Sequence, residues 1–142
     1  MKIAVIGAGE MGGAFATGLL KGNMFKPRDI IVANPHEDKL EQFAQMGACI
    51  TTDNKVAIHD VDIVALVVKP GVVKTVIDEL KSELDYDKQI VINMAASVTI
   101  AQLEEWLKKN SEVPRIFQVL PNIGIAERAS MSFITPNAKG RE

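Results

Sequence analysis

The hydrophobic residues of the chain follow two alternating spacings. Runs of consecutive apolar residues are typical of strands that are buried on both faces of a sheet. Six such strands are predicted, at 2–6, 29–33, 48–51, 63–68, 90–92 and 115–119. Between these runs, apolar residues recur at every third or fourth position, which is typical of helices. Helices are therefore predicted at 11–23, 35–46, a short stretch after 53, 72–84 and from 100 onward.

Strands that alternate with helices predict an α/β fold, a Rossmann-like, doubly wound and mainly parallel sheet with helices on both faces. Right-handed crossovers give the strand order 3-2-1-4-5-6. Ligands of such sheets bind at the carboxyl ends of the strands. There the order gathers five loops, at 7–12, 34–37, 69–71, 93–97 and 120–124.

Residues at the ends of the predicted helices support these boundaries. Asn34 suits the N-cap of the second helix, and Gly47 suits its C-terminal end. Thr52 or Asp53 caps the short third helix. The segment Thr99-Ile100-Ala101-Gln102 has the pattern of a capping box.

The length of 142 residues suits a single domain, expected at 1–135 and followed by a polar tail at 136–142 that should fray. Residues 130–135 are a candidate for one more strand. Hydrophobic residues make up 47% of the chain, which is enough for a packed core.

The charge and the cysteine content serve mainly to exclude classes of function. The net charge is −2 and no basic stripe appears, so nucleic-acid binding has no electrostatic support. No apolar run reaches membrane-spanning length, and no signal-peptide cleavage pattern is seen, so the cytoplasm is the expected compartment. The single cysteine, Cys49, is expected to be a buried apolar residue, and His59 a surface residue. No histidine or cysteine spacing suggests a metal site.

The candidate chemistry begins at the first turn. The strand at 2–6 leads directly into Gly7-Ala8-Gly9-Glu10-Met11-Gly12 and then into a helix. This is the dinucleotide-binding motif G-x-G-x-x-G, and it lies between a predicted strand and a predicted helix, as that motif requires. Gly9 lets the backbone approach a diphosphate, whose negative charge the start of the helix attracts. The alternative is a glycine-rich turn that binds nothing.

The end of the second strand favours NADP over NAD. An acidic residue there would bind the ribose hydroxyls of NAD, but this chain has Asn34. Without that carboxylate, a 2′-phosphate is not repelled. The nearby candidate cations are His36 and Lys39, whereas Glu37 and Asp38 count against NADP. NAD therefore stays open, as does the interpretation of His36 as an ordinary surface residue.

Four further segments, taken together with the glycine motif, are family-like in order and spacing. They are Thr52-Asp53-Asn54-Lys55, Val67-Val68-Lys69-Pro70, Asn93-Met94-Ala95-Ala96 and Leu120-Pro121-Asn122. In this set the chain resembles the pyrroline-5-carboxylate reductase family across nearly its whole length. The resemblance implies NAD(P)H-dependent reduction of the cyclic imine pyrroline-5-carboxylate to proline, a step of proline biosynthesis.

The resemblance also implies where each part of the coenzyme would bind. The diphosphate would lie against the glycine motif, at Ile6, Gly7, Ala8, Gly9, Glu10, Met11 and Gly12. The adenosine end would lie near Asn34, His36 and Asn54. The nicotinamide ribose and ring would lie near Val67, Val68, Lys69, Pro70, Met94, Ala95 and Ala96. Each position also has a plain structural interpretation, such as a solvated lysine or an alanine that is small for packing.

Two features depart from the family pattern. Ile123 and Gly124 follow Asn122 where the family has Thr-Pro, which puts the substrate in doubt. The family's C-terminal helical domain, which builds the dimer and much of the substrate site, is expected to lie outside this chain. A homo-oligomer is expected only if that domain exists in the full protein.

No catalytic residue or general acid can be assigned from the sequence, although Lys69 could assist electrostatically. Hydride transfer to a C=N bond needs mainly the coenzyme and its orientation. Two other functions remain open. The chain could be the coenzyme domain of a β-hydroxyacid dehydrogenase or of a deazaflavin-dependent NADP reductase. It could also be a non-catalytic module that senses nucleotides.

Overall fold

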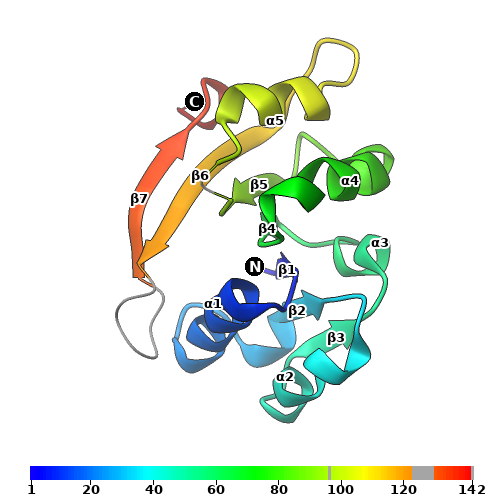
Figure 1. The fold of residues 1–142 in the computed structure, drawn as a ribbon, viewed down its shortest axis with the longest axis vertical. Helices are drawn as coiled ribbons and strands as arrows, with labels where there is room; N and C mark the ends of the chain where they lie inside the picture. Colours follow the sequence, from blue (N-terminus) through cyan, green and yellow to red (C-terminus); the bar gives the residue numbers. More distant parts are fainter. Residues whose placement is uncertain (96, 123–129, 142) are drawn as a thin grey trace.

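The computed structural model describes the backbone of residues 1–95, 97–122 and 130–141, and the side chains of 1–95, 97–119 and 136–140. One seven-stranded sheet runs through it in the order β3-β2-β1-β4-β5-β6-β7 (Figure 1). Its strands are β1 (Ile3–Ile6), β2 (Ile30–Ala33), β3 (Cys49–Thr51), β4 (Ile63–Leu66), β5 (Ile90–Asn93), β6 (Arg115–Asn122) and β7 (Ser130–Pro136).

The first six strands are parallel, and β7 pairs with β6 in the antiparallel direction. The predicted order 3-2-1-4-5-6 and the α/β class are confirmed. In this order β1 and β4 are neighbours in the middle of the sheet, with Ile6 beside Leu66 in the register. The chain winds outward from this pair in both directions, so the loops that follow β1 and β4 meet at the same edge.

Within the residues that the structure describes, five α-helices lie on the two faces. They are α1 (Glu10–Lys21), α2 (Glu41–Gln45), α3 (Asn54–Ala57), α4 (Pro70–Leu80) and α5 (Ile100–Leu107). Short 3-10 turns lie between elements at Pro27–Asp29, Glu37–Lys39 and Lys81–Glu83, and another follows β7 at Lys139–Arg141. The predicted capping box is confirmed: the Thr99 hydroxyl accepts from the Gln102 N–H while the Gln102 side chain accepts from the Thr99 N–H. Asp53 caps α3 by accepting from the Lys55 N–H.

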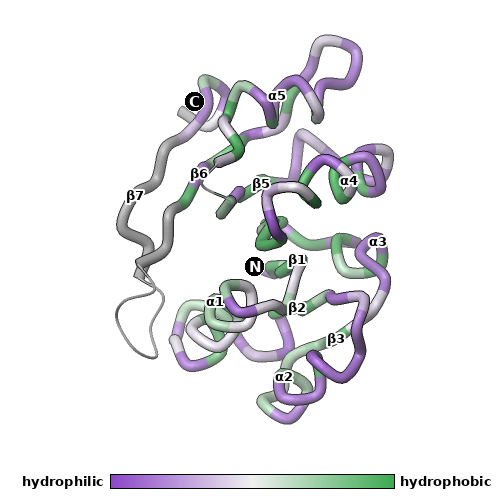
Figure 2. Tube along the Cα trace, viewed as in Figure 1, coloured by the Kyte–Doolittle hydropathy of each residue, from purple (hydrophilic) through white to green (hydrophobic). Residues whose placement is uncertain are grey.

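The sheet separates two hydrophobic clusters. One packs α3, α4 and α5 against one face, through residues such as Ile58, Ile77 and Leu103. The other packs α1 and α2 against the opposite face, through residues such as Phe15 and Phe43. Figure 2 shows the corresponding pattern, with hydrophobic segments along the central strands and hydrophilic ones at the periphery. Burial on both faces explains why the central strands read as continuous apolar runs.

Three sequence-based expectations are wrong: a continuous helix at 35–46, Asn34 as its N-cap, and a buried Cys49. The predicted helix at 35–46 is interrupted: a 3-10 turn at Glu37–Lys39 precedes the short α2. Asn34 does not cap it, because its side chain is turned into the sheet edge and bonds to the glycine loop. Cys49 is exposed rather than buried, because β3 is the last strand of its half of the sheet and one side of it is uncovered.

The tail does not fray over the part whose side chains are described. Asn137 is only 4% exposed, and its side-chain oxygen accepts from the N–H groups of Ile116 (3.0 Å) and Gly140 (2.8 Å). Its amide nitrogen donates to the Pro114 carbonyl at 3.0 Å. Composition alone could not show this, because one buried amide is enough to hold a polar segment to β6.

Replacing Asn137 with Ala is expected to lower the free energy of unfolding by about 2–3 kcal/mol, because buried partners on β6 lose their hydrogen bonds. Chemical denaturation would measure this change. Ala138→Ser, at the neighbouring exposed residue, is the matched control and should change stability by less than about 0.5 kcal/mol. Equal stability of the Asn137 variant and the control would show that the tail is not anchored in this way.

A second polar cluster, formed by Tyr86, Lys109 and the Leu107 carbonyl, lies beside the end of α5. Tyr86 is buried and donates its hydroxyl hydrogen to the Leu107 carbonyl, while the Lys109 ammonium lies 4.2 Å from the centre of the ring. Burial raises the pKa of Tyr86 to about 12, so the hydroxyl stays protonated and remains a donor over the physiological range. This cluster stabilises the fold and lies among the helices rather than at the loops after β1 and β4.

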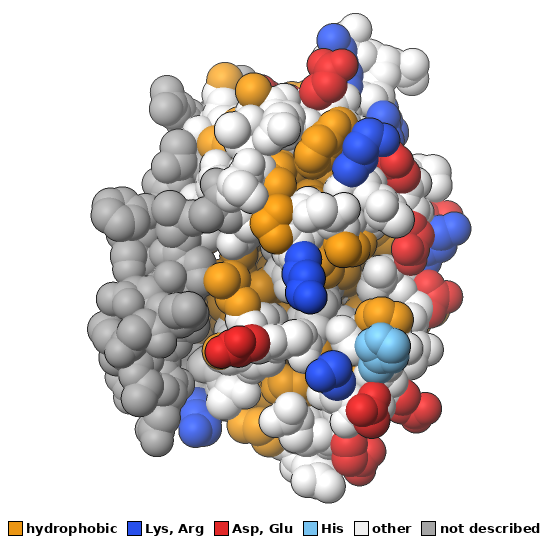
Figure 3. Space-filling view, viewed as in Figure 1, with side chains coloured by type: hydrophobic (Ala, Val, Ile, Leu, Met, Phe, Trp, Pro, Cys, Tyr) orange, Lys and Arg blue, Asp and Glu red, His pale blue; other side chains and the backbone are white. Residues whose placement is uncertain are grey.

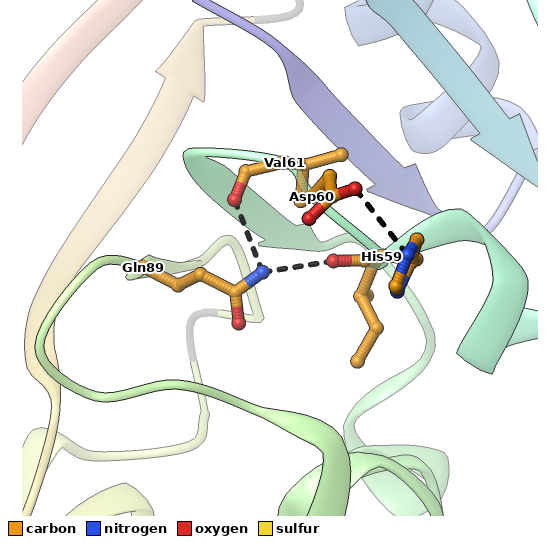
Figure 4. Close-up of polar contacts among 5 residues, drawn as sticks. His59, Asp60, Val61 and Gln89 are labelled. Carbon is orange, nitrogen blue, oxygen red and sulfur yellow. Dashed lines mark hydrogen bonds and ion pairs between the residues drawn. The ribbon is translucent and has the colours of Figure 1, made fainter.

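The amino-terminal edge of the sheet has its own buried amide. Gln89 is 6% exposed and donates to the carbonyls of Ile58 (2.8 Å) and Val61 (3.0 Å), as Figure 4 shows. Beside it, the imidazole Nε2 of His59 lies 3.3 Å from a carboxylate oxygen of Asp60, and both side chains are largely exposed. The expectation that His59 is a surface residue is confirmed. None of the described helices is long and apolar enough to cross a membrane.

Candidate functional site

Two glycines of the opening motif are required by the protein's own backbone. Gly7 has a φ of +111°, and a Cβ there would lie 2.4 Å from the Val67 carbonyl oxygen. A Cβ at Gly12 would lie 2.0 Å from the Gly7 carbonyl oxygen. These two residues therefore let the turn leave β1 and let α1 pack closely against it.

Gly9 differs from both of them. Its φ of −73° is accessible to any residue, and a Cβ added there would meet no atom within 4 Å. Neither the conformation nor the packing of the protein calls for a glycine at this position. The space over Gly9 opens at the start of α1, where a ligand could approach the backbone.

The start of α1 presents donors to that space. Gly9 is the N-cap and supplies no side-chain bond, and the first helical bond runs from the Gly13 N–H to the Gly9 carbonyl at 2.7 Å. The N–H groups of Glu10, Met11 and Gly12 therefore have no acceptor within the helix. Such a helix start binds anions through these groups and through its dipole.

Not every amide of the loop is available. The Gly7 N–H donates to the Ala33 carbonyl (2.8 Å), and the Ala8 N–H donates to the side-chain oxygen of Asn34 (3.1 Å). The sequence places Ala8 among the diphosphate-binding residues, but its N–H group is already bonded. The backbone donors that remain available for an anion are therefore those of the first turn of α1.

Asn34 connects the glycine loop to the loop after β2. Its side chain is 7% exposed, and besides accepting from Ala8 it donates to the His36 carbonyl at 3.2 Å. Its oxygen keeps a second lone pair that could accept a further bond. His36 and Lys39 follow and are exposed, and Asn54 lies partly buried at the start of α3. The residues expected near adenosine thus lie at the carboxyl ends of β2 and β3.

The loop after β4 lies directly beside the glycine motif. The Val67 N–H donates to the Ile6 carbonyl at 2.9 Å, and Val68 is partly buried. Lys69 is the N-cap of α4, with Pro70 at its first position, and both residues are exposed. Two helix starts, those of α1 and α4, therefore follow adjacent strands at one edge of the sheet.

The loop after β5 comes next along this edge. The Met94 N–H donates to the Leu66 carbonyl at 3.2 Å, and the Met94 side chain is buried in the cluster under α1. Any contact of Met94 with a ligand would therefore involve its backbone. Ala95 is buried as well. Ala96, and with it Ile123 and Gly124, lies outside the described residues.

Sequence reasoning missed the groups that hold this last loop. The side chains of Asn93 and Gln118 bond to its backbone from β5 and β6. The available signal was a single polar residue at the end of an otherwise apolar run, at 90–93. In the described part of the chain, no three His, Cys, Asp or Glu side chains gather as a metal site would require.

Charge is dispersed over the face shown in Figure 3. Its described Lys and Arg side chains stand among acidic and hydrophobic ones, and they form no continuous basic stripe on that face. An anion bound on this face would therefore be held by local backbone donors and single cations rather than by a broad positive field.

Comparison with known proteins agrees with this geometry. Residues 2–97 match the family described as NADP oxidoreductase, coenzyme F420-dependent. The chain is 35% identical over 136 residues to the pyrroline-5-carboxylate reductase of Methanosarcina acetivorans, a match that covers 95% of this chain and 49% of that protein.

Solved structures give the same picture. A pyrroline-5-carboxylate reductase from Coxiella burnetii superposes with a TM-score of 0.77 and 38% identity, covering 85% of this chain and 44% of that one. The Plasmodium falciparum pyrroline carboxylate reductase, solved with NADP bound, has a TM-score of 0.72 at 23% identity over 86% of this chain and 42% of its own, a likeness of fold alone. The chain spans about half the length of the relatives it matches.

Proposed function

Because the chain belongs to the family of NADP oxidoreductases described as coenzyme F420-dependent, and is similar to half of a pyrroline-5-carboxylate reductase, we propose that it binds NADPH for the reduction of pyrroline-5-carboxylate to proline. The observation that carries the proposal is the open space over Gly9 at the start of α1. A glycine that the fold itself does not need, in front of unpaired amides, is accounted for by a bound diphosphate.

The order of the strands supports one direction for the bound coenzyme. In a doubly wound sheet the two nucleotides lie over opposite halves, on either side of the central strand pair. The adenosine half would lie over β2 and β3, near Asn34, His36 and Asn54. The nicotinamide half would lie over β4 and β5, near Val67, Val68, Lys69, Pro70, Met94, Ala95 and Ala96.

NADP is proposed as the preferred coenzyme. The end of β2 carries the neutral Asn34 in place of a carboxylate, and the exposed His36 and Lys39 follow it. A 2′-phosphate would therefore meet no carboxylate at position 34 and two nearby cationic candidates, while the exposed Glu37 and Asp38 between them count against this choice. The solved Plasmodium falciparum protein with NADP supports the choice by analogy of fold.

The described residues would bind and orient rather than react. NADPH supplies the hydride when bound, and the protein's part is to hold the reacting carbon against the imine. The start of α1 would hold the diphosphate, and the rigid loops after β4 and β5 would hold the nicotinamide side. Lys69, exposed at the start of α4, would add positive charge there. No described residue stands out as a general acid.

Glu10 offers a test of the electrostatics at the proposed diphosphate site. Its exposed carboxylate lies in the first turn of α1, where it favours the helix but opposes a bound anion. Glu10→Gln is expected to tighten NADPH binding about two- to threefold at low salt while lowering helix stability by about 0.5 kcal/mol. The gain in affinity should vanish at high ionic strength.

Titration calorimetry at two salt concentrations would measure the Glu10→Gln effect. Glu41→Gln is the matched control, since Glu41 occupies the same place in the first turn of α2, away from the glycine loop. It should change stability without changing affinity. An unchanged or weaker affinity of the Glu10 variant at low salt would remove the diphosphate from the start of α1.

The proposed function is tested by two measurements on one preparation. Calorimetry should show NADPH binding more tightly than NADH, and NADPH absorbance should report turnover when pyrroline-5-carboxylate is added. Binding without turnover would identify this chain as the coenzyme-binding part of a longer enzyme. Failure to bind either coenzyme would overturn the proposal and favour a module without this activity.

Membership of a family described as coenzyme F420-dependent favours one alternative reaction. A deazaflavin, coenzyme F420, could take the place of the imine as the partner of NADP. Turnover with F420 and none with pyrroline-5-carboxylate would select it. A β-hydroxyacid dehydrogenase would be selected by turnover of a hydroxy acid instead.

The compartment and assembly are proposals as well. We propose the cytoplasm, because the chain's single cysteine is exposed and would remain a free thiol most readily in a reducing compartment. We propose a homo-oligomer only for a longer protein that carries the family's helical domain.

A further inference from the structure

We propose that Asn93 is a positioning residue that fixes the backbone of Ala95 and Val98 in the loop after β5, and thereby supports binding of the nicotinamide half of the coenzyme; this inference rests on the proposed function. Asn93 is the last residue of β5, and its side chain is 0% exposed. It is a polar side chain at the end of a strand that is otherwise apolar.

All hydrogen bonds of the Asn93 side chain go to that loop. Its oxygen accepts from the Ala95 N–H at 3.2 Å, and its nitrogen donates to the carbonyls of Ala95 (3.1 Å) and Val98 (3.2 Å). A buried amide without partners would cost free energy, so these bonds hold the backbone of Ala95 and Val98 against the end of β5. Apolar side chains could fill the same volume but could not hold the backbone in this way.

A second side chain converges on the same loop. Gln118 on β6 donates to the Val98 carbonyl at 2.9 Å, so this oxygen accepts from both strands. The Val98 N–H in turn donates to the Ala95 carbonyl at 3.1 Å. Ala95 and Val98 are thus bonded to each other and fastened to two strands, and the side chains of both are buried.

The position of the loop gives this rigidity a function. It follows β5 at the carboxyl edge, and the Met94 N–H is bonded to the end of β4. β4 is the neighbour of β1, whose loop carries the open space over Gly9. A dinucleotide with its diphosphate at α1 and its adenosine over β2 extends its other half toward β4 and β5. The loop held by Asn93 is therefore the surface that this half meets.

Gln89 provides a matched control within the same chain. It is also a buried amide that donates to two backbone carbonyls, those of Ile58 and Val61 (Figure 4). It precedes β5 and holds a loop at the opposite, amino-terminal edge of the sheet. Loss of this amide should cost stability as loss of Asn93 does, but it should not affect a ligand at the carboxyl edge.

The experiment compares Asn93→Ala, Gln118→Ala and Gln89→Ala by calorimetry with two ligands. NADPH contains both halves of the coenzyme, whereas adenosine 2′,5′-bisphosphate contains the adenosine half alone. Asn93→Ala should weaken NADPH binding about tenfold and leave binding of the bisphosphate within twofold of wild type. Gln118→Ala should shift NADPH in the same direction by about threefold, and Gln89→Ala should change neither ligand.

Each outcome decides the matter. Equal weakening of both ligands by Asn93→Ala, or no weakening, would overturn the inference while wild-type binding leaves the proposed function standing. Wild-type protein that binds neither ligand would overturn the proposed function, and the inference with it. If Asn93→Ala does not fold, the milder Gln118→Ala supplies the same comparison, and an unchanged NADPH affinity in it would overturn the inference.

Discussion

A Gly9→Val variant is expected to fold normally and to bind NADPH at least about 100-fold more weakly than wild type. A Cβ at Gly9 has no protein atom within 4 Å, so a branched side chain extends into the open space in front of the first turn of α1. A displaced diphosphate would lose at least two charge-assisted hydrogen bonds of about 1.5–3 kcal/mol each. A factor of 100 corresponds to about 2.7 kcal/mol, so the loss is at least this large.

Calorimetry and thermal unfolding together would check this expectation. The fold should lose only about 1 kcal/mol, since Gly9 is an N-cap without a side-chain bond. Gly12→Val is the contrasting variant: its Cβ would overlap the Gly7 carbonyl oxygen, so it should unfold the domain. Unchanged NADPH affinity in folded Gly9→Val would place the diphosphate elsewhere.

Asn34→Asp should shift the ratio of NADPH to NADH affinity about 30-fold toward NADH. The carboxylate keeps the acceptor for the Ala8 N–H but places a negative charge at the end of β2. Repulsion of a 2′-phosphate at an effective dielectric of about 20 is on the order of 2 kcal/mol, which is about 30-fold. The same carboxylate can accept hydrogen bonds from the ribose hydroxyls of NADH.

The ratio of NADPH to NADH affinity separates this effect from a loss of affinity for both coenzymes. Asn34→Asp also loses the donor to the His36 carbonyl, which should weaken both coenzymes alike. Asn110→Asp, in the loop between α5 and β6, adds the same charge at an exposed position on the amino-terminal side of the sheet and should leave the ratio unchanged. A ratio that stays at the wild-type value in Asn34→Asp would show that this residue does not face the ribose.

The fold could be predicted because its main signals are local. The run at 63–68 contains β4 because a central strand is covered on both faces, and the Thr99–Gln102 capping box begins α5 with bonds three residues apart. Gly47 has a φ of +99° just after α2, as a helix-ending glycine does. These features depend on neighbouring residues, which the sequence displays directly.

The errors have one cause. Cys49 is exposed because β3 has a neighbour on one side only, and Asn137 is buried because β6 offers it unpaired backbone groups. Asn34 serves the Ala8 N–H, 26 positions away, instead of a helix start nearby. Each outcome depends on a partner distant in the sequence, which spacing and composition do not reveal.

The sequence by itself determined the alternation of strands and helices, the turn after β1 and the glycine at the end of that turn, because backbone geometry and apolar spacing act over a few residues. The order of the strands then followed from this alternation and from right-handed crossovers. Only the tertiary structure decided which N–H groups remain available at the start of α1 and which polar side chains form hydrogen bonds within the fold. It also decided that the side chains of Asn93 and Gln118 donate to the same carbonyl, that of Val98. Those outcomes depend on contacts between strands, since a buried polar group bonds to whichever partner the packed sheet brings within reach.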